Sequence, residues 1–166
     1  MQEDLFNLQN KIKDNKKKNK KIAITPFSII ELNDTQEVIS NFKPLIKYID
    51  RYGWTCLMYA SSLNYIAIMS MFSKQTGKKD YLNNYTALMI NIIYSNGDDE
   101  MVVDILEEEI GQQDKIGNTA LMYAIRYNKI NIAKALYKKE KKYRNIFNEG
   151  VNEYINMYNK NLLEYL

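Results

Sequence analysis

The sequence predicts an all-α solenoid, built from paired antiparallel helices with β-turn tips between the pairs. Two observations carry this prediction. A threonine-led motif recurs along the chain at a nearly even period, and an apolar segment of helical length follows each copy. A fixed period of about 30 residues is typical of repeat architectures in which neighbouring units stack.

Residues 53–60 and 117–124 carry the clearest copies of the motif, GWTCLMYA and GNTALMYA, which are identical at six of eight positions. Residues 84–89 repeat it as NYTALM, and residues 25–27 begin a weaker copy with TPF. The leading threonines are separated by 30, 31 and 33 residues. Several copies at an even spacing form a strong signal, so we expect about four stacked units.

Each copy of the motif predicts two helices. The threonine hydroxyl is suited to capping the first helix, and the Leu-Met-x-Ala pattern makes that helix short and apolar. Gly53 and Gly117 suit turns that need a positive φ angle. One unit alone buries too little apolar surface to be stable, so the units must pack on one another. A second, amphipathic helix is expected near residues 37–42, 67–72, 102–106 and 131–136.

The motif resembles the ankyrin repeat, whose signature reads D-x-x-G-x-T-P-L-H-x-A. Residues 50–55 (DRYGWT) and 114–119 (DKIGNT) match its first half in full. The T-A-L-M variant is similar to repeats common in diplomonad and other protist proteins. The resemblance covers roughly residues 22–140 and implies an ankyrin-type solenoid. The histidine of the signature is replaced by Ser28, Met58, Met89 and Met122.

The predicted organisation has three parts. An N-terminal helix and a Lys-rich segment are expected over residues 1–21. The repeats are expected at about 22–49, 50–80, 81–113 and 114–140. Residues 141–166 suit either a C-terminal cap or a degenerate repeat, and the sequence leaves both alternatives open.

Composition argues against several function classes. The chain has 166 residues and a net charge of only +3, which is too mild to indicate nucleic-acid binding by itself. The absence of histidine removes the commonest general base and metal ligand. Cys56, the single cysteine, takes a small-residue position of the motif and is expected to be buried, and Glu107–Glu109 are expected to form a solvated face. We therefore expect neither an enzyme nor a cofactor or metal.

Two sequence patterns bear on the cellular location of the protein. Residues 1–4 (MQED) lack the basic region and apolar stretch of a secretory signal. No apolar run approaches the ~18 residues of a membrane span. An intracellular, cytoplasmic protein is expected, and a nuclear location stays open.

The resemblance implies a non-catalytic protein–protein interaction module, a scaffold or adaptor. Ankyrin proteins usually bind through their turn tips and the concave face of their first helices. Trp54, at a turn, ranks first, because Trp, Tyr and Arg are enriched at binding hot spots. The competing interpretation is that these rings pack only on neighbouring repeats. The residues expected to contact a partner are Arg51, Tyr52, Trp54, Tyr59, Tyr85, Lys115, Asn118, Tyr123, Arg126 and Tyr127.

A basic run near the N-terminus supports a different function. It could contact RNA, acidic lipid or an acidic protein surface, or it could be a solvated tail. The alternative function is a structural component of a large assembly, such as a ribosome or the cytoskeleton, anchored partly by this run; a parasite effector is the other alternative. The run consists of Lys16, Lys17, Lys18, Lys20 and Lys21.

Overall fold

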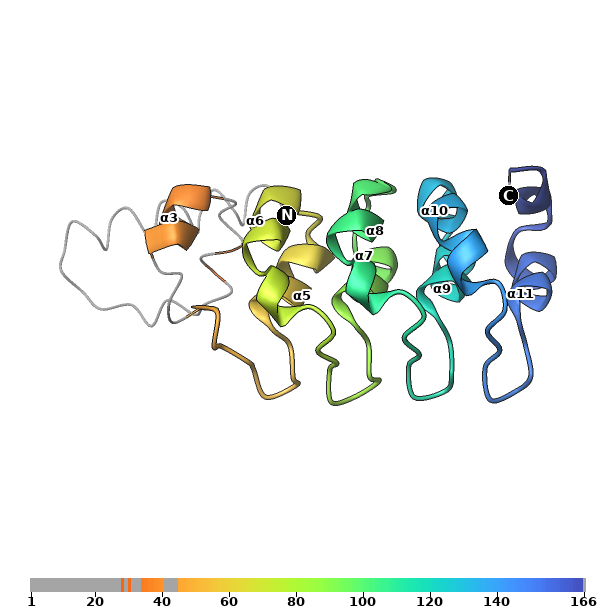
Figure 1. Ribbon diagram of the computed structural model, residues 1–166, viewed down its shortest axis with the longest axis horizontal. Coiled ribbons are helices and arrows are strands. Elements are labelled where there is room, and N and C mark those ends of the chain that lie inside the picture. The colour runs from red at the N-terminus through yellow and green to blue at the C-terminus, as the bar shows by residue number, and fades with distance from the viewer. Residues whose placement is uncertain (1–27, 29, 31–33, 41–44, 166) are drawn as a thin grey trace.

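The structure is a computed structural model that describes residues 28, 30, 34–40 and 45–165. Helical units follow one another in a row, and each contributes helices to two layers (Figure 1). The first layer contains α5 (Cys56–Ser62), α7 (Ala87–Tyr94), α9 (Ala120–Arg126) and α11 (Val151–Tyr158). The second layer contains α3 (Thr35–Ser40), α6 (Ile66–Met71), α8 (Met101–Ile105) and α10 (Ile130–Glu140).

Short 3-10 helices complete the second layer. η1 (Ser73–Gln75) follows α6, η2 (Glu107–Glu109) follows α8, and η3 (Lys160–Glu164) follows α11. The described residues contain no β-strand, only an isolated bridge between Ile49 and Thr55. None of the described helices is both long and apolar enough to cross a membrane. The predicted all-α solenoid of paired helices is confirmed.

A threonine precedes α5, α7 and α9. Thr55 and Thr86 cap their helices as predicted, whereas Thr119 makes no side-chain capping bond at α9. The Thr55 hydroxyl accepts a hydrogen bond from the Met58 N–H at 3.2 Å, and Thr86 accepts one from Met89 at 3.4 Å. The sulfur of Met58 accepts in return from the Thr55 N–H at 3.5 Å. Methionine at the histidine position of the signature therefore does more than fill space, because it completes a reciprocal cap at α5.

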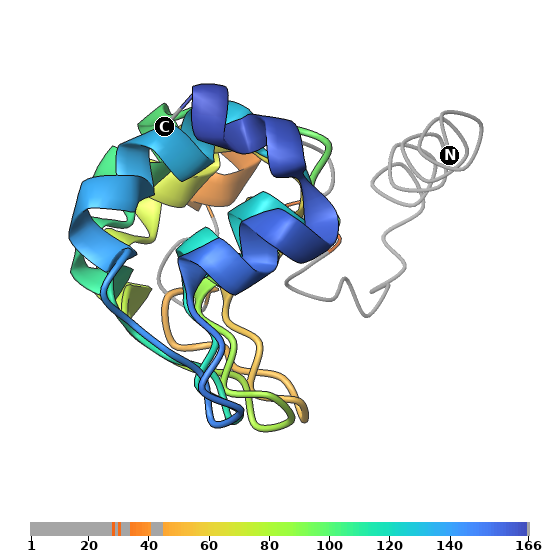
Figure 2. The same ribbon diagram turned by 90° about the vertical axis from the view of Figure 1, so that its right-hand side faces the viewer.

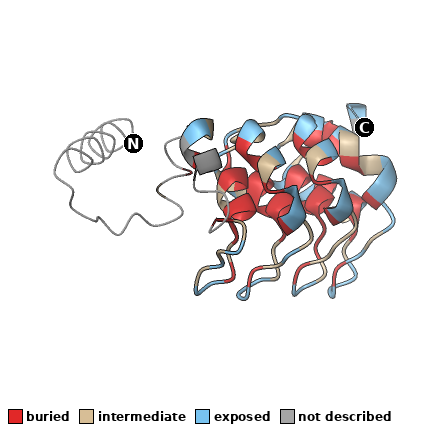
Figure 3. Cartoon of the chain, turned by 60° about the vertical axis from the view of Figure 1, so that its left-hand side comes forward, coloured by how far each residue is buried: buried red, intermediate tan, exposed pale blue. Residues whose placement is uncertain are grey.

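The core lies between the layers and between successive units (Figure 3). Leu57, Leu88 and Leu121, each the second residue of a first-layer helix, are fully buried. Burying one such side chain contributes about 1.5–3 kcal/mol. Cys56 is also buried, as expected, and burial raises the pKa of its thiol to about 12. The thiol therefore stays protonated and packs in the core.

Four hairpins connect the units and project to one side of the helices (Figures 1 and 2). In the first hairpin, the Asp50 carboxylate accepts from the backbone N–H groups of Tyr52 and Trp54, both at 2.8 Å. Gly53 has a φ angle of +85° at the turn, as predicted. The third hairpin repeats this arrangement around Asp114 and Gly117. The hairpins span residues 46–54, 76–85, 110–118 and 141–149.

The fourth hairpin lies in the segment whose character the sequence left open. The Asn145 side chain accepts from the N–H groups of Phe147 at 3.0 Å and Glu149 at 2.9 Å, as the aspartates do in earlier hairpins. Asn148 takes the left-handed turn conformation, with a φ angle of +61°. α11 begins at Val151, 31 residues after the start of α9. A further hairpin and helix therefore follow the third in the same register.

Candidate partner-binding surface

A row of aromatic side chains runs along the first-layer helices and the hairpin stems. We call it the aromatic face. The Trp54 ring packs edge-on against Tyr59, with ring centroids 6.0 Å apart, and against Tyr94 of the next unit at 5.8 Å. Such pairs hold the rings in place without burying them fully. The aromatic face consists of Trp54, Tyr59, Tyr85, Tyr94, Tyr127 and Tyr158.

The exposed members of the aromatic face share one position in the repeat. This position lies eight residues after the helix-preceding residue, which is Thr55, Thr86, Thr119 or Gly150. It is occupied by Leu63, Tyr94, Tyr127 and Tyr158 respectively. All four side chains are exposed. The sequence analysis selected Tyr127 and missed Tyr94 and Tyr158. Their constant distance from the start of the motif is the signal that would have found them.

Arg126 supplies the charge of this face. Its guanidinium lies over the rings of Tyr127 and Tyr158, at 5.9 and 5.5 Å from their centroids. It is the only charged residue in α5, α7 and α9. The surface is therefore broadly aromatic and nearly neutral, with one cation held by ring contacts from two units.

Two of the predicted contact residues are buried, which corrects the sequence analysis. Asn118 is 2% exposed and Tyr123 is 4% exposed. The Tyr123 hydroxyl donates to Asp114 at 2.5 Å, and the Asn118 side-chain oxygen accepts from Tyr154 at 2.7 Å and from Asn145 at 3.1 Å. The bond from Asn145 ties the third hairpin to the fourth, and the bond from Tyr154 ties it to α11. They leave no surface on either residue for a partner to contact.

Burial also fixes the protonation of this network. It raises the pKa of the Tyr123 hydroxyl, and the hydrogen bond to Asp114 raises it further. The hydroxyls of Tyr123 and Tyr85 lie 3.3 Å apart, and their rings meet edge to face at 5.6 Å. Tyr123 thus acts as a neutral donor beneath the aromatic face, where it supports Tyr85.

The ends of the hairpins form a second surface, which we call the hairpin tips. The predicted residues Arg51, Tyr52 and Lys115 are exposed there. Exposure of the apolar tip side chains ranges from 40% for Ile116 to 67% for Ile146. The sequence analysis missed half of this surface because it did not recognise the fourth hairpin and took only Tyr85 from the second. The hairpin tips consist of Arg51, Tyr52, Tyr81, Leu82, Lys115, Ile116, Ile146 and Phe147.

Buried acidic residues hold the hairpin stems against the helices. The Glu109 carboxylate accepts from the Leu88 N–H at 2.7 Å and from the Gly77 N–H at 2.9 Å. Glu140 does the same for Leu121 and Gly111, both at 2.7 Å. Each carboxylate therefore joins the start of a first-layer helix to the stem of the hairpin that precedes it.

Glu109 contradicts the expectation that Glu107–Glu109 form a solvated face. Glu107 and Glu108 are exposed, whereas Glu109 is buried. Desolvation raises the pKa of Glu109 and of Glu140 above the ordinary value, although the backbone hydrogen bonds act in the opposite direction. The corresponding side chain of the preceding unit is Gln75, which accepts from the Leu57 N–H at 2.8 Å. Gln75, Glu109 and Glu140 thus share one structural role: each ends the second-layer helices of its unit and accepts from the start of a first-layer helix.

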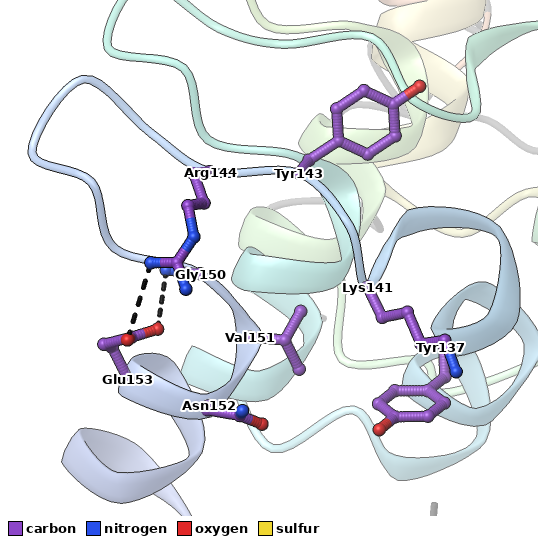
Figure 4. A pocket seen from close by; sticks show the side chains of 8 residues that line it. All are labelled: Tyr137, Lys141, Tyr143, Arg144, Gly150, Val151, Asn152 and Glu153. Carbon is purple, nitrogen blue, oxygen red and sulfur yellow. Dashed lines mark hydrogen bonds and ion pairs between the residues drawn. The ribbon is translucent and has the colours of Figure 1, made fainter.

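A small hollow lies between α10 and α11, beside the fourth hairpin (Figure 4). Its volume is about 150 Å³, below the ~300 Å³ at which pockets for small ligands begin. Arg144 and Glu153 form an ion pair of 3.5 Å at its edge. Glu153 also accepts from the Gly150 N–H at 2.8 Å, which lowers the pKa of its carboxyl. These polar groups already satisfy one another.

The basic run from Lys16 to Lys21 lies outside the described residues. Whether it contacts RNA, lipid or protein therefore stays a prediction.

Comparison with known families agrees with the geometry. Residues 71–146 match a family model described as ankyrin repeats, in three copies. A search of curated proteins found no match to the chain. Ankyrin repeats are generally protein–protein interaction modules, and the family is typically non-catalytic. Together with the stacked helix pairs and projecting hairpins, this match identifies residues 71–146 as ankyrin repeats.

Proposed function

We propose that this protein is a non-catalytic scaffold or adaptor that holds a protein partner on its aromatic face. The observation that carries the proposal is the exposed tyrosine row of Tyr94, Tyr127 and Tyr158, in one register across three units. Tyrosine and arginine are the residue types enriched at binding hot spots. Scattered surface aromatics would need no explanation, but a row in register is a continuous surface.

Binding to this surface requires little ordering of the protein. Tyr94 is held against Trp54 and Tyr127 lies stacked on Tyr123 at a centroid distance of 6.5 Å, so the rings are positioned before a partner arrives. A preformed surface loses less side-chain entropy on association. Arg126 is the only charged residue of α5, α7 and α9, so the matching partner surface is largely apolar, with polar groups for the tyrosine hydroxyls.

We also propose that residues 141–166 are a terminal repeat rather than an unrelated cap, after repeats at about 22–49, 50–80, 81–113 and 114–140. The hydrogen bonds of Asn145 and the left-handed Asn148 support this division.

The test replaces the tyrosine row and compares captured proteins. Full-length protein and a Tyr94→Ala, Tyr127→Ala variant are used as baits in native extract, and captured proteins are quantified by mass spectrometry. Tyr165→Ala is the matched control, because Tyr165 is an exposed tyrosine beside Lys134 of the second layer. We expect a partner to be lost with the double variant and kept with the control. Equal capture by all three baits would contradict the proposal.

A further inference from the structure

The hairpin tips carry protruding apolar side chains, and several basic side chains lie on the same hairpins. Their apolar side chains protrude into solvent: Leu82 is 59% exposed and Phe147 is 65% exposed. Large apolar side chains that gather on one exposed surface mark an interaction site. Tyr52, Tyr81, Ile116 and Ile146 belong to the same tips, so each of the four hairpins contributes at least one such side chain.

The exposed charged side chains of the hairpins are all positive. The acidic side chains point into the fold or pair locally: Asp80 and Asp114 are buried, Asp50 accepts two backbone N–H groups, and Glu149 accepts from Asn145. Within the four hairpin segments, all of which are described, every exposed charged residue is basic. These residues are Lys47, Arg51, Lys78, Lys115, Lys141, Lys142 and Arg144.

In the second and fourth hairpins lysines are set behind the tips, whereas Arg51 and Lys115 lie at the tips of the first and third. The apolar side chains lie at the extreme ends, whereas Lys78 precedes Tyr81 by three residues and Lys142 precedes Ile146 by four. At about 3.3 Å per extended residue, these lysines lie roughly 10–13 Å behind the tips. That distance is comparable to the screening length of about 8–10 Å at physiological salt. The lysines therefore still interact electrostatically with charges that lie level with the tips.

The four tips also share a direction. They project to the same side of the helices and end at a similar level in a row (Figures 1 and 2). Side chains at the ends of four protrusions do not form a groove for a peptide. They can all touch a broad, flat surface at once.

We propose that the hairpin tips dock this protein on an anionic membrane surface. The apolar tip side chains enter the interfacial region of the bilayer, and the lysines and arginines behind them meet the negatively charged lipid headgroups. Apolar insertion and attraction to anionic lipid are the two contributions that hold proteins at membrane interfaces. Tyr52 and Tyr81 fit this place, because tyrosine presents an apolar ring and a polar hydroxyl at the boundary.

An acidic protein surface fits these observations less well. It would meet the outermost groups of the hairpins first, and those groups are mainly apolar, with the cations mostly set behind them. A bilayer has the matching order, with charge at its surface and apolar chains beneath. The proposed docking is independent of the protein partner of the aromatic face, so either can fail alone.

Vesicle co-sedimentation tests the proposal with the full-length chain. The vesicles are phosphatidylcholine alone and phosphatidylcholine mixed with phosphatidylserine. We expect binding to the mixed vesicles only, and weaker binding as salt rises. Leu82→Ser together with Phe147→Ser should weaken it by about tenfold or more, because two apolar side chains no longer enter the bilayer. Met101→Ser, an exposed apolar residue of α8, is the matched control and should not change it.

The basic run at Lys16–Lys21 could also attract anionic vesicles, so it needs a separate variant. In a chain with these five lysines replaced by glutamine, binding that still depends on Leu82 and Phe147 supports the proposal. Lys78→Gln with Lys142→Gln should weaken binding, whereas Lys134→Gln with Lys138→Gln on α10 should not.

Three results would overturn membrane docking by the tips. The first is full binding by the Leu82→Ser, Phe147→Ser variant, which would assign vesicle binding to the basic run. The second is equal binding to neutral vesicles. The third is no vesicle binding at all, which would leave an acidic protein surface as the occupant of the tips.

Discussion

The units of α9 and α11 share a backbone register but differ in the burial of their side chains. In α9, which packs between α7 and α11, Leu121 and Ile125 are fully buried. In α11 the same two positions hold Asn152 and Asn156, which are exposed. Repeat arrays need a polar outer face on their terminal units to stay soluble. The difference indicates that the unit of α11 closes the apolar core.

The two units also satisfy their helix starts differently. The second N–H of α9, that of Leu121, bonds to the buried Glu140 of the second layer. At α11 the nearby carboxylate is Glu153 of the same helix, which reaches back to the Gly150 N–H and pairs with Arg144 at the surface. The unit of α9 therefore depends on a contact between layers, whereas the unit of α11 caps its helix locally.

The largest expected effect comes from truncating the apolar residue of the internal unit. Leu121→Ala should lower the free energy of unfolding by about 2–5 kcal/mol, because it removes a fully buried side chain and leaves a cavity. Asn152→Ala, at the same position of α11, should change it by less than about 0.5 kcal/mol. Urea unfolding of both variants measures the contrast. Equal losses would mean that α11 does not end the core.

A smaller effect is expected from removing the buried carboxylate. Glu140→Ala leaves the N–H groups of Leu121 and Gly111 buried without their acceptor, which should cost about 2–4 kcal/mol. Glu153→Ala removes a carboxylate at the surface and should cost clearly less. Thermal unfolding of the matched pair gives the comparison. A larger loss for Glu153→Ala would show that the local cap, not the contact between layers, dominates.

The smallest expected effect is on the pH dependence of stability. The pKa shifts of the buried carboxyl groups and of Glu153 have opposite signs. Burial raises the pKa of Glu109 and Glu140 above 4.5, so the unfolded chain ionises before the folded one. Their contribution to stability is fully present below pH 4.5 and is lost as pH rises through the raised pKa. The pKa of Glu153 is lowered, so its contribution is present above pH 4.5 and is lost as pH falls through the lowered pKa.

Two variants are compared with the wild-type protein by urea unfolding across this pH range. The first is the double variant Glu109→Gln, Glu140→Gln, and the second is Glu153→Gln. Relative to the first variant, the wild-type protein should lose stability as pH rises above 4.5. Relative to the second, it should gain stability as pH rises from the lowered pKa of Glu153 to 4.5, and the difference should then stay constant. The same sign for both variants would contradict the assignment of the buried pair.

The sequence was sufficient for the fold where the motif is intact. Thr55, Thr86, Gly53 and Gly117 were assigned correctly because each performs a local task, a cap or a turn, that its residue type reveals. The fourth hairpin was not recognised, since asparagine replaces aspartate at Asn145 and glycine replaces the capping threonine. Only the spacing, not the residue types, carries the repeat there.

The candidate site was harder to predict, because burial depends on contacts between units. Asn118 occupies the same position as Trp54, yet it turns inward because Tyr154 and Asn145 of the next unit offer hydrogen bonds. Glu109 is the last of three consecutive glutamates, and nothing in that run distinguishes it from its exposed neighbours. Both outcomes follow from tertiary neighbours that a single motif does not contain.

The central claim is that the aromatic face meets a protein partner, and site-specific photo-crosslinking tests it most directly. A photoreactive amino acid is placed at Tyr94, Tyr127 or Tyr158, or at Met101 on the opposite layer as the control. We predict that the three tyrosine positions form an adduct with the same protein, identified by mass spectrometry, and that Met101 does not. Adducts from Met101 but none from the tyrosine row would contradict the account.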